Sequence, residues 1–252
     1  MDLTNHHAIV TGGATGIGLA VTQALCNEGA RVTVMGRNKQ RLDELAATND
    51  LIGAIEVDIT DPQSVEQAFK AASAVQPISI LINNAGAADT AAFHKMTFEH
   101  WQRMLSINLT GTFLTTQAAL SDIKAANYGR IINIASTSGL KGYAYTSAYS
   151  AAKHGVIGLT RSLSLELSNT MVTVNAICPG FTNTAIVADA IENITTKTQR
   201  NEAQALEDLV SHNPQKRLIE VDEIAETVLW LCNPKSGSVT GQSIVIAGGE
   251  LM

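Results

Sequence analysis

Hydrophobic residues along the chain gather in short runs, and between these runs they recur every three or four positions. The runs lie near His7–Val10, Arg31–Met35, Ala54–Val57, Ser79–Ile82, Arg130–Ile134, Val172–Ala176 and Ser243–Ile246. Short apolar runs bounded by turn residues are typical of strands buried on both faces. The three- and four-residue spacing indicates amphipathic helices between them. Examples are Gly16–Glu28, Lys39–Ala47, Pro62–Ala74 and Glu223–Cys232.

This alternation predicts an α/β fold of the Rossmann type, a doubly wound parallel sheet of about seven strands flanked by helices. In such a sheet the ligand site lies at the carboxyl ends of the strands. One stretch breaks the rhythm, because residues 183–213 are polar, rich in threonine and weakly periodic. We therefore predict a single dinucleotide-binding and catalytic domain over residues 1–252, with a substrate lid at about 183–213.

Composition narrows the classes of protein that remain. The 252 residues can form one sizeable core, and a net charge of -6 argues against a nucleic-acid surface. The first residues lack the basic segment of a signal peptide, and no apolar run approaches the roughly 20 residues of a spanning helix. We expect a cytoplasmic protein that binds no membrane. The three cysteines and six histidines lack metal-ligand spacing, so neither a disulfide framework nor a metal site is expected.

A glycine-rich segment follows the first predicted strand and leads into a helix. Residues 11–18 read Thr-Gly-Gly-Ala-Thr-Gly-Ile-Gly. Glycines allow a tight turn and a close approach of backbone N–H groups to a pyrophosphate, and the helix start adds the positive end of its dipole. A plain strand-to-helix turn is the alternative. The residues predicted to contact a dinucleotide here are Gly12, Thr15, Gly16, Ile17 and Gly18.

The end of the second strand bears on which cofactor is used. An NAD site places an acidic residue here to bind the ribose hydroxyls, but this chain has Gly36 followed by Arg37. A guanidinium suits a 2′-phosphate, and the missing carboxylate removes a repulsion. The sequence therefore favours NADP(H), with NAD(H) still possible. Arg37 could instead be an ordinary solvated charge.

Tyr149 and Lys153 lie four residues apart, so on a helix they share one face. An ammonium near a phenol is expected to lower the phenol pKa and make it a usable acid or base. Ser136 lies thirteen residues before Tyr149, at the end of a predicted strand. Its hydroxyl could hold a substrate carbonyl, although Ser138 competes for that role.

Taken together, these motifs resemble one family over essentially the whole chain. Their order and spacing are similar to those of the short-chain dehydrogenase/reductase family, and in particular to its 3-oxoacyl and polyketide ketoreductase-like members. The motifs are Thr11-Gly12-x-x-x-Gly16-Ile17-Gly18, Asn83-Asn84-Ala85-Gly86, Asn108, Ser136, Tyr149-x-x-x-Lys153 and Pro179-Gly180.

The resemblance implies a catalytic role for four residues. Tyr149 would be the general acid in reduction and the base in oxidation, and Lys153 would tune it and bind the nicotinamide ribose. Ser136 would orient the carbonyl. Asn108 would hold a water in a proton relay from Lys153; its alternative role is an asparagine that kinks a helix through backbone bonds.

The resemblance also implies cofactor contacts further along the chain. Asp58 and Ile59 would lie at the adenine, although Asp58 could instead cap a helix. Asn84, Ala85 and Gly86 would line the adenosine ribose. The residues expected to border the nicotinamide carboxamide are Pro179, Gly180, Thr182 and Thr184.

The expected reaction is the reversible reduction of a carbonyl to a secondary alcohol with NADP(H). Two alternatives remain, an NAD-dependent alcohol or hydroxyacyl dehydrogenase and a non-catalytic NADP(H)-sensing protein. A β-keto acyl derivative or a simple ketone fits the predicted pocket walls, and the family resemblance implies a homotetramer. These walls are Leu140, Tyr143, Tyr145, Phe181, Ile186 and Val187.

Overall fold

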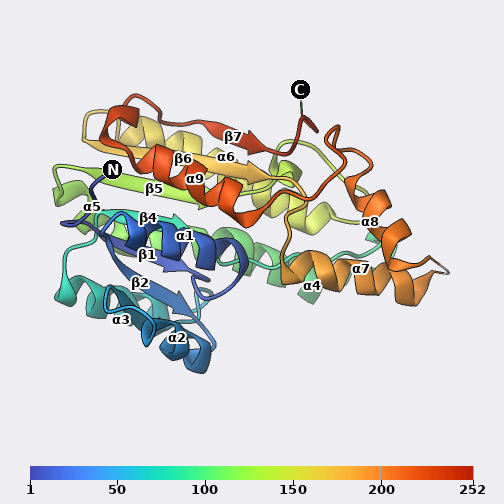
Figure 1. Cartoon of the computed structure of the whole chain (residues 1–252), viewed down its shortest axis with the longest axis horizontal. Coiled ribbons are helices and arrows are strands. Elements are labelled where there is room, and N and C mark those ends of the chain that lie inside the picture. The colour runs from blue at the N-terminus through green and yellow to red at the C-terminus, as the bar shows by residue number, and fades with distance from the viewer. Residues whose placement is uncertain (199, 252) are drawn as a thin grey trace.

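The computed structural model describes residues 1–198 and 200–251, and a seven-stranded parallel sheet forms its centre (Figure 1). The strand order is β3-β2-β1-β4-β5-β6-β7, so the chain winds outward in both directions from β1 and β4. This confirms the predicted doubly wound α/β fold. The strands are β1 (His7–Thr11), β2 (Arg31–Gly36), β3 (Ile52–Glu56), β4 (Ile80–Asn83), β5 (Gly129–Ile134), β6 (Val172–Pro179) and β7 (Ser243–Ile246).

Helices cover both faces of the sheet and enclose two apolar cores. One core packs α1 and α9 against the strands through residues such as Leu25 and Val228. The other packs α3, α5 and α6 through Phe69, Ile123 and Leu163. The helices are α1 (Gly16–Asn27), α2 (Lys39–Ala46), α3 (Pro62–Val75), α4 (Phe98–Leu105), α5 (Gly111–Ala125), α6 (Ser147–Glu166), α7 (Ala185–Lys197), α8 (Glu202–Val210) and α9 (Val221–Cys232).

The predicted boundaries hold within a few residues for most strands. The sixth strand extends three residues beyond its predicted end, to Pro179, and β3 begins at Ile52 rather than Ala54 and ends at Glu56. Ile52 pairs with Val32, while Glu56 pairs with Gly36 at the end of β2. Pairing with β2 therefore fixes this edge strand, where hydrophobicity alone gives a weak signal.

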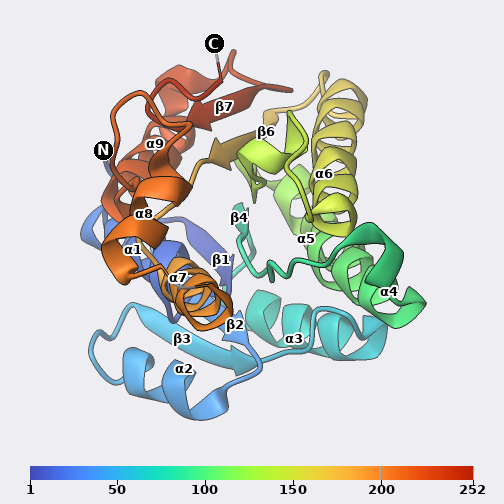
Figure 2. The ribbon, with the colours of Figure 1, turned by 90° about the vertical axis from the view of Figure 1, so that its right-hand side faces the viewer.

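The weakly periodic segment predicted as a lid contains two helices, α7 and α8. The start of α8 has a capping box, in which the Asn201 side chain accepts from the Gln204 backbone and Gln204 bonds back to Asn201. This reciprocal capping begins a helix whose apolar residues recur at helical spacing, although the segment as a whole is weakly periodic. In Figure 2, α7 and α8 lie on one side of the strand ends, with α4 and α6 on the other.

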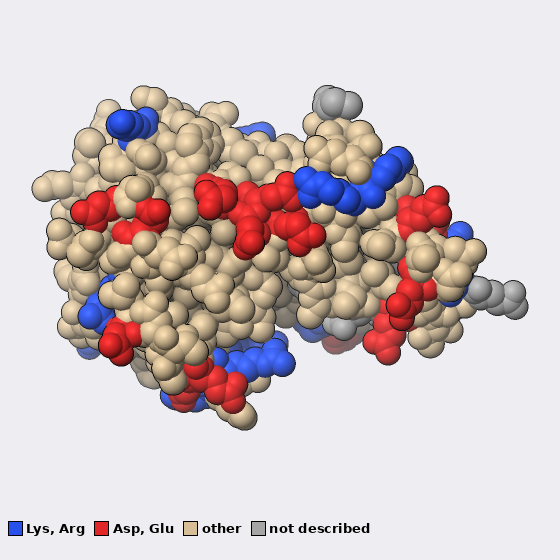
Figure 3. All heavy atoms as spheres, viewed as in Figure 1, with Lys and Arg blue, Asp and Glu red and all other residues tan. Residues whose placement is uncertain are grey.

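Charge on the molecular surface is mixed. On the face in Figure 3 an acidic band crosses the middle of the molecule and smaller basic groups flank it. This distribution agrees with the net charge of -6 and makes this face unsuited to a phosphate backbone. Within the described parts of the chain, the helices are too short or too polar to cross a bilayer.

Candidate active site

The glycine loop between β1 and α1 has the backbone of a tight phosphate-type turn. Gly12 and Gly16 adopt left-handed φ angles of 65° and 52°, which favour glycine. A Cβ at Gly18 would collide with the Gly12 carbonyl oxygen, so a side chain cannot enter here. Asn84 fastens the loop to β4, because its Nδ2 donates to the carbonyls of Thr11 at 3.0 Å and Gly12 at 3.2 Å.

The start of α1 presents its first turn to this loop. Thr15 occupies the N-cap position, and its exposed side chain makes no capping hydrogen bond to the part of the chain described. Ile17 follows in the first turn and is half-buried. First-turn N–H groups are the backbone donors that bind anions at helix starts. The structure thus brings the five predicted glycine-loop residues together around one helix start.

The end of β2 leaves open space where an acidic residue would stand in an NAD site. The nearest atom to a Cβ built on Gly36 is Leu42 Cδ2, 3.9 Å away. Arg37 is exposed beside it, and its charge helps to lower the pKa of Asp58. The larger causes of that lowering are two hydrogen bonds from Thr60, through its hydroxyl at 2.7 Å and its backbone N–H at 2.9 Å.

Asp58 does not cap a helix, since Asp61 holds the N-cap position of α3 and accepts from the Gln63 N–H at 3.0 Å. Asp58 therefore does not take the alternative role of a helix cap, and its carboxylate is exposed. Ile59 is buried, and its side chain packs against Gly111 in α5. A cofactor contact by Ile59 would thus use its backbone.

The long helix α6 carries Tyr149 and Lys153 on one side, as their spacing predicts. Lys153 is only 5% exposed, and its Nζ donates to the Ile134 carbonyl of β5 at 2.8 Å. The same Nζ lies 5.7 Å from the centre of the Tyr149 ring. A buried ammonium needs such a partner to offset its lost hydration. The bond to β5 therefore holds Lys153 at the carboxyl end of the central strands.

Ser136 follows β5 in an extended conformation, and its hydroxyl accepts from the Ser138 N–H at 3.1 Å. It also interacts with the phenol of Tyr149. Ser138 is buried, and its backbone N–H is the donor in the bond to the Ser136 hydroxyl. The structure thus places the Ser136 hydroxyl beside Tyr149.

The pKa of Tyr149 differs from the expectation drawn from sequence. Burial raises it above the ordinary value of a phenol, and the hydrogen bond with Ser136 opposes this only in part. The expected lowering by Lys153 is wrong here, because the Lys153 ammonium is directed at the Ile134 carbonyl. Burial also lowers the pKa of Lys153 to about 8. Tyr149 is therefore held as a protonated phenol, the form that an acid needs.

Asn108 lies in a short π-helix, η2 (Ser106–Thr110), between α4 and α5. Its Nδ2 donates to the carbonyls of Ala87 at 2.8 Å and Met104 at 3.1 Å, and its Oδ1 accepts from the Ala87 N–H at 3.2 Å. These backbone bonds fit the helix-kinking alternative. A Cβ on Gly86 would lie 2.9 Å from Asn108 Oδ1 and 3.7 Å from Lys153 Nζ, so both side chains approach Gly86 closely.

Sequence reasoning assigned Cys178 to packing, but the structure places it next to the catalytic candidates. Burial raises the pKa of the Cys178 thiol to about 11, while a hydrogen bond with the Ser136 backbone and the Lys153 charge oppose the rise. The sequence signal that could have placed Cys178 near the site was its position immediately before Pro179-Gly180. In the structure every residue of its strand, β6, is buried. The Cys178 thiol therefore remains protonated and is hydrogen-bonded to the Ser136 backbone. All three cysteines are free and buried.

The chain after β6 returns over the glycine loop. Gly180 donates its N–H to Ile246 of β7 at 2.9 Å, and its carbonyl accepts from the Thr182 hydroxyl at 3.0 Å. Thr184 reaches Gly16, since its Cγ2 would lie 3.2 Å from a Cβ there. The predicted nicotinamide segment and the predicted pyrophosphate loop are therefore neighbours.

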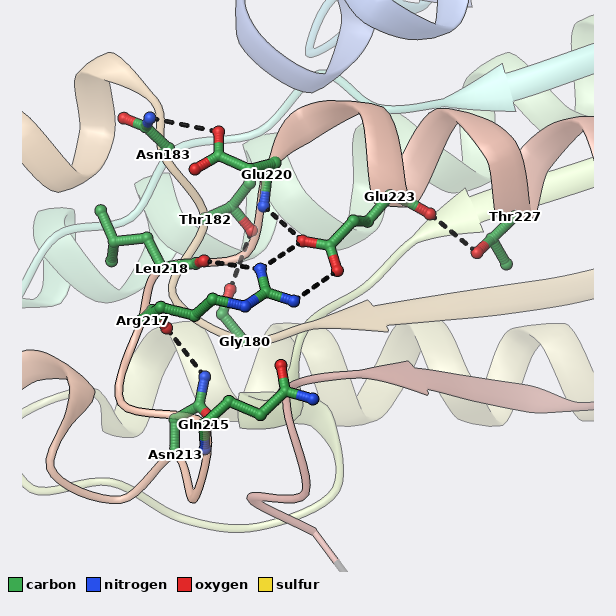
Figure 4. Close-up of polar contacts among 10 residues, drawn as sticks. All are labelled: Gly180, Thr182, Asn183, Asn213, Gln215, Arg217, Leu218, Glu220, Glu223 and Thr227. Carbon is green, nitrogen blue, oxygen red and sulfur yellow. Dashed lines mark hydrogen bonds and ion pairs between the residues drawn. The ribbon is translucent and has the colours of Figure 1, made fainter.

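The residues that follow the predicted lid are tied to the start of α9, as Figure 4 shows. Arg217 forms a bidentate ion pair with Glu223, with N···O distances of 2.6 and 2.8 Å. Ile219 lies beside the base of the lid, where its N–H donates to Phe181 and its carbonyl accepts from Asn183, both at 2.9 Å. Both ends of the segment are therefore anchored at one place.

Several predicted pocket walls line the same region. The Tyr143 and Phe181 rings meet edge to face, with centroids 6.3 Å apart. Val187 is buried, whereas the Ile186 side chain lies outside what the structure describes. Tyr145 is 65% exposed with a left-handed φ of 67°, and its carbonyl accepts from the Ala91 N–H at 2.9 Å. Tyr145 thus belongs to the rim and not to the interior.

Comparison with known proteins agrees with this geometry. Residues 6–195 match the family model described as short chain dehydrogenase. A Streptomyces violaceoruber protein that carries the name of a granaticin polyketide synthase ketoacyl reductase is 36% identical, covering 96% of this chain and 92% of its own length. The D-beta-hydroxybutyrate dehydrogenase of Rhizobium meliloti is 32% identical, covering 96% and 97%.

A solved structure of a variant of actinorhodin polyketide ketoreductase with NADPH superimposes with a TM-score of 0.93. It is 33% identical to this chain, and the match covers 99% of each. Family model, relatives and fold agree over nearly the whole length. The chain therefore belongs to the short-chain dehydrogenase family and is an oxidoreductase.

Proposed function

We propose that this oxidoreductase is an NADP(H)-preferring ketone reductase that converts the carbonyl of a β-keto acyl derivative or a simple ketone to a secondary alcohol, reversibly. The observation that carries the proposal is the grouping of Ser136, Tyr149 and Lys153 at the carboxyl ends of β5 and β6, beside the glycine loop. An acid, a carbonyl-binding hydroxyl and a dinucleotide-type turn meet there. This is the set that hydride transfer to a ketone requires.

The cofactor cradle of the chain fits a phosphorylated dinucleotide. Gly12, Gly16 and Gly18 leave a turn that a Cβ would fill, and the nicotinamide cofactor supplies the hydride when bound. Arg37 would pair with a 2′-phosphate in the open space at Gly36. The remaining contacts would come from Thr15, Ile17, Asp58, Ile59, Asn84, Ala85, Gly86, Tyr149, Lys153, Pro179, Gly180, Thr182 and Thr184.

In the reductive direction the protein supplies the proton. Ser136 donates a hydrogen bond to the ketone oxygen, and the Tyr149 phenol gives its proton to that oxygen as the carbonyl carbon gains hydride. The carbonyl thus gains one hydride and one proton and becomes an alcohol. Lys153 would bind the nicotinamide ribose, and Asn108 would hold a water that returns a proton to Tyr149 through Lys153.

The names of the relatives support the substrate class. One is named for ketoacyl reduction and another for the oxidation of D-beta-hydroxybutyrate, and these names bracket a β-keto group and its alcohol. The apolar and phenolic walls around Tyr143 and Phe181 suit a mid-sized, mostly apolar ketone. We further propose that residues 183–213 close over it as a lid within a single domain.

The deciding experiment follows the oxidation of NADPH and NADH with a panel of β-keto thioesters, β-keto esters and simple ketones. We expect turnover with NADPH that is lost in Tyr149→Phe. The control Tyr145→Phe removes an exposed phenol from the loop just before α6 and should retain activity. Tight NADPH binding without turnover on any compound would contradict the reductase proposal and favour a cofactor-sensing protein.

Two broader properties complete the proposal. Members of this family are expected to form homotetramers, and we expect the same state for this chain in the cytoplasm. Light scattering coupled to size-exclusion chromatography gives the mass in solution. A mass equal to the 26.6 kDa chain would contradict the tetramer.

A further inference from the structure

The last turn of the chain places a buried carboxylate against the loop that follows the catalytic serine. Glu250 lies beyond β7, and its side chain is only 2% exposed. Its Oε1 accepts from the Tyr143 hydroxyl at 2.5 Å and lies 3.0 Å from Lys141 Nζ. Burial of a carboxylate is costly unless it is paired, so these two partners account for its position.

This cluster borders the proposed substrate site on two sides. The Tyr143 hydroxyl is also hydrogen-bonded to the hydroxyl of Thr137 at 2.8 Å, and Thr137 directly follows Ser136. On the other side, a Cβ on Gly180 would lie 3.3 Å from Glu250 Oε2. Glu250 is therefore packed between the loop after β5 and the segment after β6.

Two charged residues, Lys141 and Glu250, meet in this cluster. Between Ser136 and Tyr149 the sequence contains a single charged residue, Lys141, and the residues after β7 contain a single one, Glu250. The Lys141 side chain is 33% exposed, and its ammonium also lies 4.7 Å from the centre of the Tyr143 ring. Without Glu250, the ammonium would be a cation beside the pocket, available to a substrate carboxylate.

We infer that Glu250 is a specificity-determining residue: by neutralising Lys141 in the pocket wall, it makes the enzyme select uncharged ketones over β-keto carboxylates. The inference rests on the proposed ketone reductase function. It narrows the substrate class to neutral ketones, esters and thioesters. A carboxylate would lose its hydration without gaining a free cation from this part of the wall.

The test compares kcat/KM for ethyl acetoacetate with kcat/KM for acetoacetate, both with NADPH. These two substrates carry the same ketone and differ in charge. Glu250→Gln should lower the ester-to-acid ratio by about tenfold or more through a gain on acetoacetate, because the freed Lys141 ammonium can pair with the carboxylate. Lys141→Met should raise the ratio, because it leaves the Glu250 carboxylate unneutralised.

Two further variants separate charge from packing. The double variant Glu250→Gln with Lys141→Met removes both charges and should return the ratio to within about threefold of the wild type. Tyr143→Phe keeps both charges and the ring but removes a hydrogen bond, so it should leave the ratio unchanged. If the gain in kcat/KM for acetoacetate persists in the double variant, a loosened wall explains the gain, and the inference is overturned.

An unchanged ratio in both Glu250→Gln and Lys141→Met would also overturn it, provided that the wild type reduces the ester. Failure of the wild type to oxidise NADPH with either substrate would instead overturn the proposed function, and this inference with it. The thermal midpoint and the Kd for NADPH of each variant verify that the fold and the cofactor site are kept.

Discussion

The two ends of the proposed active site are built differently. At the catalytic end, Lys153 and Asn108 are almost fully buried, and each is held by hydrogen bonds to the backbone of another element. At the end that faces the adenosine, Arg37 and Asp58 are exposed, and Gly36 beside them leaves open space. The catalytic end is thus fixed by the core of the fold. The cofactor-selecting end depends on exposed side chains with few constraints.

This difference indicates that cofactor choice can change more easily by mutation than the reaction type. A substitution at the catalytic end disturbs packing and chemistry together. A substitution at the end of β2 changes the charge that a cofactor meets and leaves the core intact. Reaction type and cofactor choice should therefore respond independently to mutation.

The largest expected effect follows from removing the catalytic phenol. Tyr149→Phe should lower kcat by about 10²- to 10⁴-fold, because no side chain then gives the proton. The Kd for NADPH should stay within about threefold, since the ring remains. Steady-state kinetics and fluorescence titration give the two quantities. Retention of more than about a tenth of the activity would show that Tyr149 is not the acid.

Burial of Lys153 should give a pH dependence of stability. Its pKa falls from 10.5 to about 8 in the folded protein, so between these values the unfolded chain binds more protons. The free energy of unfolding should therefore rise with pH across this window, by up to about 3 kcal/mol.

Guanidinium unfolding at about pH 7.5 and about pH 10 measures this rise. Lys153→Met should abolish the contribution, whereas Lys124→Met, which alters an exposed lysine of α5, should keep it. Equal rises in all three proteins would refute a lowered pKa at Lys153.

A carboxylate introduced at the end of β2 tests the cofactor-selecting end of the proposed site. Gly36→Asp should weaken NADPH binding by about tenfold through repulsion of the 2′-phosphate, while NADH binding holds or improves. Gly36→Ala is the matched control, since the nearest atom to its Cβ would be 3.9 Å away. If Gly36→Ala and Gly36→Asp weaken NADPH binding equally, the loss is steric, and the argument from charge fails. Fluorescence titration distinguishes the two cases.

The smallest effect on stability is expected at the exposed ion pair between Arg217 and Glu223, at the start of α9. The bond from Arg217 holds the pKa of Glu223 down to about 2, below its usual 4.5. Its contribution to stability is complete above about pH 4.5 and is lost as pH falls toward 2. Glu223→Gln should therefore lower Tm slightly at neutral pH, and the difference should shrink on acidification. A difference that is independent of pH would point to lost packing instead.

Much of the fold and of the site follows from local sequence signals. Alternating apolar runs predicted the sheet, and glycine spacing predicted the loop where Gly12 and Gly16 adopt left-handed angles. Other features depend on residues far apart in the sequence. The pKa of Tyr149 is set by burial, and Cys178 lies beside Ser136 only through the pairing of β5 with β6.

Helix α8 has local signals of its own, because a capping box begins it and its apolar residues recur at helical spacing. The residues after β7 show a stronger limit. Glu250 follows the last strand by only a few residues, and its partner Lys141 is more than a hundred residues away. No local pattern predicts such a pair, because the sheet brings the two segments together.

The most direct test of the account compares kcat/KM for NADPH and NADH in the wild type, in Arg37→Ala and in the matched control Arg41→Ala, which removes an exposed arginine of α2. We predict that the wild type prefers NADPH and that Arg37→Ala loses about 10- to 100-fold on NADPH, with NADH nearly unchanged. The control should resemble the wild type. Equal losses with both cofactors, or a wild type that prefers NADH, would contradict the account.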